Sequence, residues 1–407
     1  MPNRLTRYRA FNARLGLTSA ASALEQNHYV KRPGQAAADQ IASHMELSPT
    51  SVIALVGGIG SGKTTALLVA MKQLIQAEDT RAVYVDVGQF HDLQRIETGV
   101  IVAAVGLALC KLVDKSARDS LNNELQRAIQ SFRQWAEPQE EWIPYDELAL
   151  RRMQKEEEDS FVRVKEPGKL TLPNKLSDEL ESQRKNFAMI REAYASAYLI
   201  GFIDGLDRLA SIEQFQEAID EDLRFLQAEG LGLVVTAPLL SLFGKYRTAL
   251  SRFEHIIVVH PVDISGPRGE NEFLCEVLKT RDPDGVLSSE AREILARDSG
   301  GVLRDLLALA KAAARNAYML GRDTVTGPDV LVASDQLART LFLGLGDDDL
   351  KVLQRIRKQG SFVTTSDRDL ALLMTRRVLE YPQADKPPRF AVHPTMLPLL
   401  HLAVDSP

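Results

Sequence analysis

Cysteine and long apolar runs are both scarce in this sequence. Only two cysteines occur among 407 residues, Cys110 and Cys275, and neither belongs to a Cys-x-x-Cys pair or a Cys/His cluster. A disulfide framework and a structural zinc site are therefore excluded, and we expect a reducing, cytoplasmic location. The longest apolar stretch, Val100 to Leu109, is far shorter than the roughly 18 residues that span a bilayer, so we expect no membrane partner.

A surplus of basic charge is missing as well. The chain has 49 Lys and Arg against 55 Asp and Glu, a formal charge of −6, which excludes a chain-wide nucleic-acid coat and leaves only local patches for such contacts. With 45% hydrophobic and 26% charged residues, the composition is that of an ordinary globular protein. At about 150 residues per domain, the length predicts two or three domains.

The N-terminal segment, residues 1–26, departs from the acidic average. Its first twenty residues contain Arg4, Arg7, Arg9 and Arg14 and no acidic side chain. A transit-like peptide, a basic arm for nucleic acid and a solvated tail all fit this pattern. We expect a solvated tail, because short charged termini are common and usually disordered.

Five short apolar runs indicate buried strands of an α/β fold. They are separated by segments with helical spacing, and they lie at 51–56, 81–87, 198–204, 231–237 and 255–260. Continuous apolar runs that alternate with helices are typical of a mostly parallel sheet covered on both faces. We therefore expect an α/β core over residues 27–265.

The remaining segments are predicted to be an insertion and two C-terminal units. About 110 residues separate the second and third runs, which requires an insertion at about 98–196; its charged stretch at 155–159 and the Pro- and Lys-rich 164–179 are expected to be exposed. Helical patterns predict a helical unit at 266–340. Two helices followed by two short β-rich pieces predict a winged-helix-like unit at 345–407.

The motif GGIGSGKT follows the first predicted strand and precedes a helix. It satisfies the phosphate-loop (P-loop) pattern G-x-x-x-x-G-K-[ST], and the strand and helix around it make the match specific. Its backbone N–H groups and the helix N-terminus would hold phosphates, Lys63 would reach the β- and γ-phosphates, and the Thr64 hydroxyl would ligate Mg²⁺. The predicted ATP-binding residues of the loop are Gly57, Gly58, Ile59, Gly60, Ser61, Gly62, Lys63, Thr64 and Thr65.

Polar residues at other strand ends would complete an Mg²⁺-nucleotide site. Asp204 ends the third apolar run and would hold the metal. Asp207 could polarise the attacking water, or it could cap a helix or pair with Arg208. Thr236 could orient the water or touch the γ-phosphate, or it could cap the turn before Pro238.

Arg304 begins a long predicted helix after a glycine pair, in GGVLRDLL. From that position its guanidinium could reach the γ-phosphate, since arginine binds phosphate through several hydrogen bonds. A surface salt bridge is the alternative.

These four elements, in this order, resemble the AAA+ and STAND branch of P-loop ATPases over about residues 27–337. The resemblance rests on GGIGSGKT, FIDGLDRL, VVTAP and GGVLRDLL. It implies that the segment HYVKRPG lines an adenine pocket through Tyr29, Val30 and Arg32. It also implies a helical lid and a C-terminal winged helix of the kind found in origin-recognition-type proteins.

The second acidic motif departs from the AAA+ pattern, because Gly205 stands where a catalytic glutamate is usual. The form DGLD resembles NACHT-type STAND proteins, and Asp-x-x-Asp-Arg is similar to the KAP group. Hydrolysis is therefore expected to be slow or to depend on assembly. The resemblance also implies an arginine finger donated to a neighbouring subunit of a homo-oligomer, for which Arg247 and Arg252 are the candidates, with paired surface arginines as the alternative.

Three functions remain open at this stage. The first is an ATP-driven molecular switch that controls a protein partner. In bacteria, ATPases that this sequence resembles often serve in anti-phage defence, and the resemblance implies this setting. The second is a DNA-acting initiator or transposition regulator: residues 350–407 carry nine Lys and Arg against five Asp and Glu, a local charge of +4. Its phosphate-contact candidates are Arg376, Arg377, Lys386 and Arg389. The third is a nucleotide-binding scaffold that does not turn over.

Overall fold

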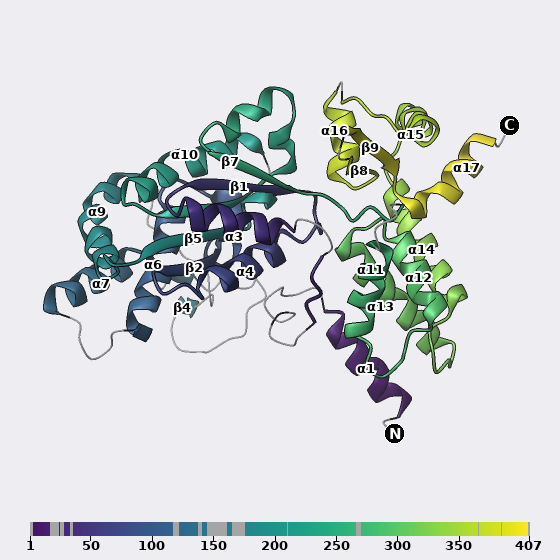
Figure 1. The fold of residues 1–407 in the computed structure, drawn as a ribbon, viewed down its shortest axis with the longest axis horizontal. Coiled ribbons are helices and arrows are strands. Elements are labelled where there is room, and N and C mark those ends of the chain that lie inside the picture. Colours follow the sequence, from purple (N-terminus) through teal and green to yellow (C-terminus); the bar gives the residue numbers. More distant parts are fainter. Residues whose placement is uncertain are drawn as a thin grey trace. The chain divides into compact units, whose positions relative to one another are not determined.

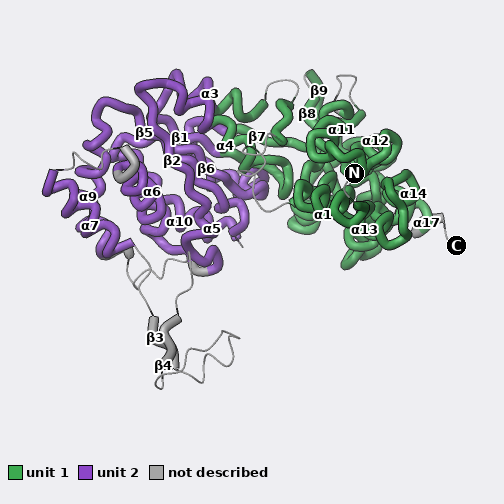
Figure 2. The backbone as a smooth tube through the Cα atoms, turned by 90° about the horizontal axis from the view of Figure 1, so that it is seen from below, with its two compact units in different colours: residues 1–41, 55–70, 257–407 green, residues 42–54, 71–256 purple. Residues whose placement is uncertain are grey.

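The computed structural model has two compact units. It describes residues 3–16, 24, 28–32, 36–116, 122–136, 141–144, 161–164, 176–209, 211–265, 270–364, 366–383 and 385–405. Unit 1 consists of residues 1–41, 55–70 and 257–407, and unit 2 consists of residues 42–54 and 71–256 (Figure 2). The charged stretch at 155–159 and most of 164–179 lie outside the described residues.

A five-stranded sheet forms the α/β core, and its strands correspond to the five apolar runs. Its order is β2-β5-β6-β1-β7, and both β2 and β6 pair with β5 in parallel (Figure 1). The strands are β1 (Val52–Gly57), β2 (Thr80–Asp86), β5 (Tyr198–Asp204), β6 (Gly232–Ala237) and β7 (His255–Val259). Every residue of β1 and β6 is buried, which explains why their sequences are continuous apolar runs without alternation.

Helices and short turns surround the strands of unit 2, and the first of them, α3, is divided between the two units. They are α3 (Ala37–Leu47), α5 (Val87–Phe90), η1 (Leu93–Arg95), α6 (Val100–Ser116), α7 (Asn123–Ala136), α9 (Leu176–Glu192), η2 (Leu206–Arg208), α10 (Ile212–Ala228), η3 (Leu239–Leu242) and η4 (Gly244–Leu250). The insertion also holds a short antiparallel pair, β3 (Glu141–Pro144) and β4 (Phe161–Val164), which the sequence pattern did not indicate.

A buried carboxylate links two helices of unit 2. Asp222 of α10 is fully buried and accepts hydrogen bonds from the backbone N–H groups of Gly99, Ile101 and Val102, at 2.6, 2.8 and 3.3 Å. It therefore satisfies N–H groups at the start of α6 that have no partner inside the helix. Burial raises the pKa of Asp222 to about 7, although the three N–H donors oppose the shift.

The helical unit predicted at 266–340 is present. It consists of α11 (Glu270–Thr280), α12 (Ser289–Asp298), α13 (Leu303–Met319) and α14 (Gly327–Phe342), which share one buried apolar cluster in unit 1. α4 (Lys63–Leu74) follows the P-loop and is divided between the two units.

The N-terminal segment differs from the solvated tail that we expected. Residues Arg4–Arg14 form helix α1, and its Tyr8, Phe11 and the following Leu15 are buried in the apolar cluster of the helical unit (Figure 1). Two of its arginines bind the loop before α12: Arg14 pairs with Asp284 at 2.8 Å, and Arg7 donates to the Asp284 carbonyl at 3.0 Å. The basic residues thus hold an amphipathic helix in place, which charge counting alone did not predict.

The C-terminal small domain contains two helices and a β-hairpin, in the predicted order. Its elements are α15 (Asp347–Gln359), α16 (Asp367–Met374), β8 (Val378–Gln383), β9 (Lys386–Val392), η5 (Pro394–Met396) and α17 (Leu397–Asp405). β8 and β9 pair antiparallel, with Gln383 opposite Lys386. The turn is therefore shorter than the segment PQADKPP suggested.

Candidate nucleotide site

The P-loop folds as the motif predicts. Gly60 and Gly62 have φ angles of +81° and +101°, which favour glycine, and Lys63 begins α4. Lys63 is buried, and its Nζ donates to the carbonyls of Gly57 at 2.8 Å and Gly58 at 3.0 Å. Two uncharged backbone carbonyls of the loop thus hold the Lys63 ammonium group.

Two further features fit the residues to a phosphate. Ser61 Oγ is buried without a hydrogen-bond partner among the described residues. A Cβ at Gly57 would lie 2.6 Å from the Val259 carbonyl, so the loop needs glycine there. A lysine, an unsatisfied hydroxyl and the N–H groups of a helix start form a donor set that suits an anion. ATP would supply the transferable phosphate and Mg²⁺ would neutralise its charge, with Thr64 as a metal ligand on this side.

The first turn of α13 lies directly against the P-loop. The Arg304 N–H donates to the Gly60 carbonyl at 3.4 Å, and a Cβ at Gly60 would lie 2.4 Å from Arg304 Cβ. A Cβ at Gly62 would likewise lie 3.3 Å from Leu303 Cδ1. The Arg304 side chain is exposed, and no ion pair of it occurs within the described ranges. Its position agrees with the predicted role as a γ-phosphate sensor, which stays a prediction.

The segment that contains Tyr29, Val30 and Arg32 is anchored within unit 1. Arg32 donates to the carbonyls of His260 and Pro261 at 2.8 and 3.0 Å, and Val30 packs against the apolar cluster of the helical unit. Arg281 holds the His28 carbonyl at 2.9 Å. Burial lowers the pKa of His260 to about 4, helped by the Arg32 charge, so this imidazole is neutral at pH 7. The adenine-pocket assignment stays a prediction.

Asp204 is buried at the carboxyl end of β5, in unit 2. The Tyr84 hydroxyl of β2 donates to Asp204 Oδ2 at 3.0 Å, and the Gly205 N–H donates to Oδ1 at 2.8 Å. Burial and the Asp204 charge raise the pKa of Tyr84 far above its ordinary value, so Tyr84 stays a donor. These two donors orient the Asp204 carboxylate, and its role as a metal ligand stays a prediction. The sequence analysis did not single out Tyr84.

Gly205 has a structural reason to be glycine. Its φ is +96°, and a Cβ there would lie 2.8 Å from Asp86 Oδ1. Asp86 ends β2 directly opposite Asp204 and caps α5 through the Gly88 N–H at 3.1 Å. A glutamate at position 205 would therefore meet left-handed backbone strain and the Asp86 carboxylate. The same signal that identified Asp204, an acid at the end of an apolar run, also marks Asp86.

The pKa of Asp86 lies above its ordinary value. Burial is the main cause that raises the pKa of Asp86; the Asp204 and Asp207 carboxylates add to it, and Arg208, 3.9 Å away, opposes it.

The two candidates for orienting the water have different surroundings. Asp207 is half-buried in the first turn of η2; Gly205 is the cap residue of that turn, and Arg208 pairs with Asp86. Thr236 is fully buried at the end of β6, and its hydroxyl has no hydrogen-bond partner in the described part of the chain. Because a buried hydroxyl without a partner costs about 1–3 kcal/mol, Thr236 is suited to bind water or ligand. Both roles remain predictions.

The two arginine-finger candidates also differ. Arg252 is half-buried and forms an ion pair with Asp220 of α10. Arg247 is exposed on η4, and no ion pair of it occurs among the residues that the structure describes. Arg247 is therefore the better candidate for reaching another subunit.

Three of the four proposed DNA-contact residues bind their own chain. Arg376 pairs with Asp305, Arg377 donates to the Leu341 carbonyl at 2.7 Å, and Arg389 binds Asp263 at 2.7 Å. Lys386 is exposed near the hairpin turn. The role of these residues in DNA binding stays a prediction, and their contacts in the structure are internal to unit 1.

No protein-family model and no curated protein matches the sequence. Among solved structures, the chain is similar to the Aeropyrum pernix ORC1 protein in complex with DNA, at 15% identity and a TM-score of 0.46, over 96% of both chains. It is also similar to Drosophila ORC bound to DNA, at 13% identity and a TM-score of 0.44, over 100% of this chain and 94% of that chain. The Thermotoga maritima RuvB Holliday junction branch migration motor matches at 16% identity and a TM-score of 0.39, over 92% of this chain and 96% of that chain.

The class is defined by the chain's own features. A parallel sheet in the order β2-β5-β6-β1-β7, a P-loop after β1 and a helical unit whose first turn meets that loop form an α/β P-loop fold with a helical unit and a small C-terminal domain. Within the described residues, no helix is long and apolar enough to cross a membrane.

Proposed function

We propose that this chain is an ATP-binding and ATP-hydrolysing switch of the AAA+ type. The observation that carries the proposal is the meeting of Lys63, the P-loop glycines and the first turn of α13 within unit 1. The Arg304 N–H lies 3.4 Å from the Gly60 carbonyl, so a nucleotide phosphate held by the loop would lie close to the start of the lid helix. Binding of a γ-phosphate could thereby set the position of the lid.

The ligands that we propose for Mg²⁺ are Thr64, in the first turn of α4, and Asp204, at the end of β5, because hydroxyl and carboxylate oxygens suit this ion. Asp207 and Thr236 are proposed to orient the attacking water. Because Gly205 stands where a catalytic glutamate is usual, we expect slow turnover that rises on assembly.

In an assembled oligomer, an arginine of one copy would add positive charge to the nucleotide site of the next copy. We propose that Arg247 of one copy completes the site of the next in a homo-oligomer, because it is exposed while Arg252 is paired with Asp220. The assembled form would act on a protein partner. The subtype, whether STAND, NACHT-like or KAP-like, and a role in anti-phage defence rest only on the DGLD motif.

The test is release of phosphate from Mg-ATP by the wild type, Lys63→Ala, Asp204→Asn and Lys72→Ala. Lys72 is an exposed lysine on the same helix and serves as the matched control. We expect Lys63→Ala and Asp204→Asn to lose about a hundredfold in rate, because each removes charge stabilisation of the transferring phosphate, and Lys72→Ala to stay near wild type. Equal background rates for all four proteins would leave only a nucleotide-binding scaffold.

A further inference from the structure

The C-terminal domain holds the first turn of α13 through a buried ion pair. Arg376 donates from Nε to Asp305 Oδ2 at 2.9 Å and from Nη2 to Oδ1 at 3.1 Å, and the Asp305 side chain is 4% exposed. His393 is also fully buried, with Nε2 3.6 Å from Asp305 Oδ2 and Nδ1 2.9 Å from Thr395 Oγ1. Burial alone would raise the pKa of Asp305, but His393 and Arg376 hold it below its ordinary value. Asp305 is therefore a carboxylate with two partners from one domain.

The backbone at Arg376 is adapted to this contact. Its φ is +61°, and no other non-glycine residue in the described ranges has a positive φ. A side chain in this region strains the backbone, and the surrounding contacts must offset that strain. Arg376 is the second residue after α16, so the left-handed residue turns the chain and aims the guanidinium at α13.

A second contact fixes the turn that precedes α13. The buried Tyr381 of β8 donates its hydroxyl to the Gly300 carbonyl at 2.8 Å. A Cβ at Gly300 would lie 2.5 Å from Leu379 Cδ1 and 2.9 Å from Pro394 Cδ. The C-terminal domain thus contacts Gly300, the first residue of the glycine pair. The second residue, Gly301, contacts the chain after β7, because its carbonyl accepts a hydrogen bond from the Val262 N–H at 3.0 Å.

Arg304 lies between these contacts and the P-loop. It is the neighbour of Asp305 in sequence, and its Cβ abuts Gly60. We infer that Arg376 is a positioning residue for the nucleotide site: through Asp305 it fixes the first turn of α13, and thereby the arginine that faces the γ-phosphate. This inference rests on the proposed function and extends it, because Arg376 of the C-terminal domain then determines how well the site distinguishes ATP from ADP.

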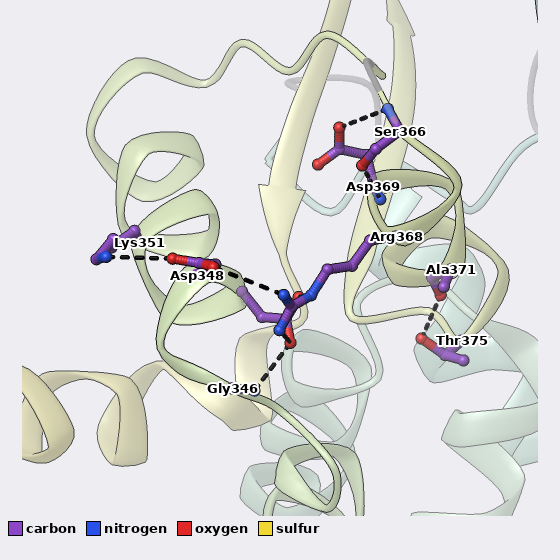
Figure 3. A network of polar contacts seen from close by, with 9 residues as sticks. Gly346, Asp348, Lys351, Ser366, Arg368, Asp369, Ala371 and Thr375 are labelled. Atoms are coloured by element: carbon purple, nitrogen blue, oxygen red, sulfur yellow. Dashed lines mark hydrogen bonds and ion pairs between the residues drawn. The ribbon is translucent and has the colours of Figure 1, made fainter.

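A matched ion pair in the same domain provides the control. Arg368 of α16 binds Asp349 of α15 through two hydrogen bonds, at 2.6 and 2.8 Å, and Figure 3 shows its side chain among Gly346, Asp348 and Lys351. Asp349 also caps α15 through the Gly346 N–H. Both pairs are two-point Arg–Asp contacts, but only the Arg376 pair reaches α13.

The experiment uses the full chain and compares the wild type with Arg376→Gly, Arg376→Lys, Arg368→Ala and Arg304→Ala. Glycine at 376 removes the guanidinium and relieves the left-handed backbone, so this variant is expected to fold. Affinity for a non-hydrolysed ATP analogue and for ADP is measured by calorimetry. Amide hydrogen exchange of the first turn of α13 is measured without nucleotide.

We expect Arg376→Gly to speed exchange in that turn and to lose about tenfold in affinity for the ATP analogue, with ADP affinity nearly unchanged. Lysine at 376 should be intermediate because it keeps the charge without the two-point geometry. Arg304→Ala should show the same loss for the analogue, and the double variant Arg304→Ala/Arg376→Gly no further loss, since both act through one contact. Arg368→Ala should match the wild type.

The inference is overturned if Arg376→Gly binds the analogue as the wild type does while Arg304→Ala does not, or if exchange at α13 is unchanged. A loss of equal size for ATP analogue and ADP also overturns it, because that is the result of a general loosening of the fold. A wild type that binds neither nucleotide would instead refute the proposed function, and the inference with it.

Discussion

Glycine 205 shows how one residue explains an unusual acidic motif. Its backbone is left-handed, and Asp86 of the neighbouring strand occupies the space that a side chain would enter. A glutamate at this position would therefore meet both backbone strain and a carboxylate. The sequence shows the glycine and suggests slow hydrolysis, but the reason for it lies in a residue 119 positions earlier, which only the strand register brings opposite.

We predict that Gly205→Ala lowers the free energy of unfolding by about 2–4 kcal/mol, from left-handed strain together with the contact to Asp86. Denaturant unfolding measures the change. Gly244→Ala is the control, because Gly244 has a φ of +50° and no atom within 4 Å of the added Cβ. Its loss should come from the backbone alone and be smaller; equal losses for the two variants would contradict the contact with Asp86.

Asp222 links α10 to the start of α6, and its ionisation makes this link depend on pH. The folded pKa of about 7 lies above the ordinary value of 3.8, so the folded chain holds a proton at Asp222 that the unfolded chain releases. Between these two values the stabilising contribution is lost as pH rises.

We predict that the free energy of unfolding of the wild type, relative to Asp222→Asn, falls from pH 4 to pH 7 and is flat above that. The asparagine does not titrate, so the difference isolates this carboxyl group. Denaturant unfolding at a series of pH values is the measurement. A difference that rises over this range would mean that the three N–H donors at α6 outweigh burial.

Helix α1 is predicted to contribute to the stability of the helical unit. Phe11 is fully buried, so Phe11→Ala should cost about 3–5 kcal/mol in the free energy of unfolding. Leu5 of the same helix is 37% exposed, and Leu5→Ala should cost under about 1 kcal/mol. Similar small losses for both variants would show that α1 does not pack on the unit in solution.

At the scale of the whole molecule, the sequence predicted the features that depend on local signals better than those that depend on long-range contacts. The P-loop, the five strands and the helices from α11 to α16 follow from apolar runs, glycines and helical spacing, all of which are local. Tyr84 and Asp305 were missed because their roles depend on partners far away in the chain, whereas Asp86 carries the same local signal as Asp204. Charge counts predicted Arg376 as a phosphate contact, and they could not show its ion pair with the buried Asp305.

The most direct test of the account is equilibrium binding of Mg-ATP to the wild type and to Lys63→Ala, with Lys72→Ala as the control for the loss of a lysine. We predict saturable binding by the wild type and by Lys72→Ala, and a loss of at least about tenfold for Lys63→Ala, because the buried ammonium group is held where the phosphates would lie. Unaltered affinity in Lys63→Ala, or no binding by the wild type, would contradict the assignment of this loop as a nucleotide site.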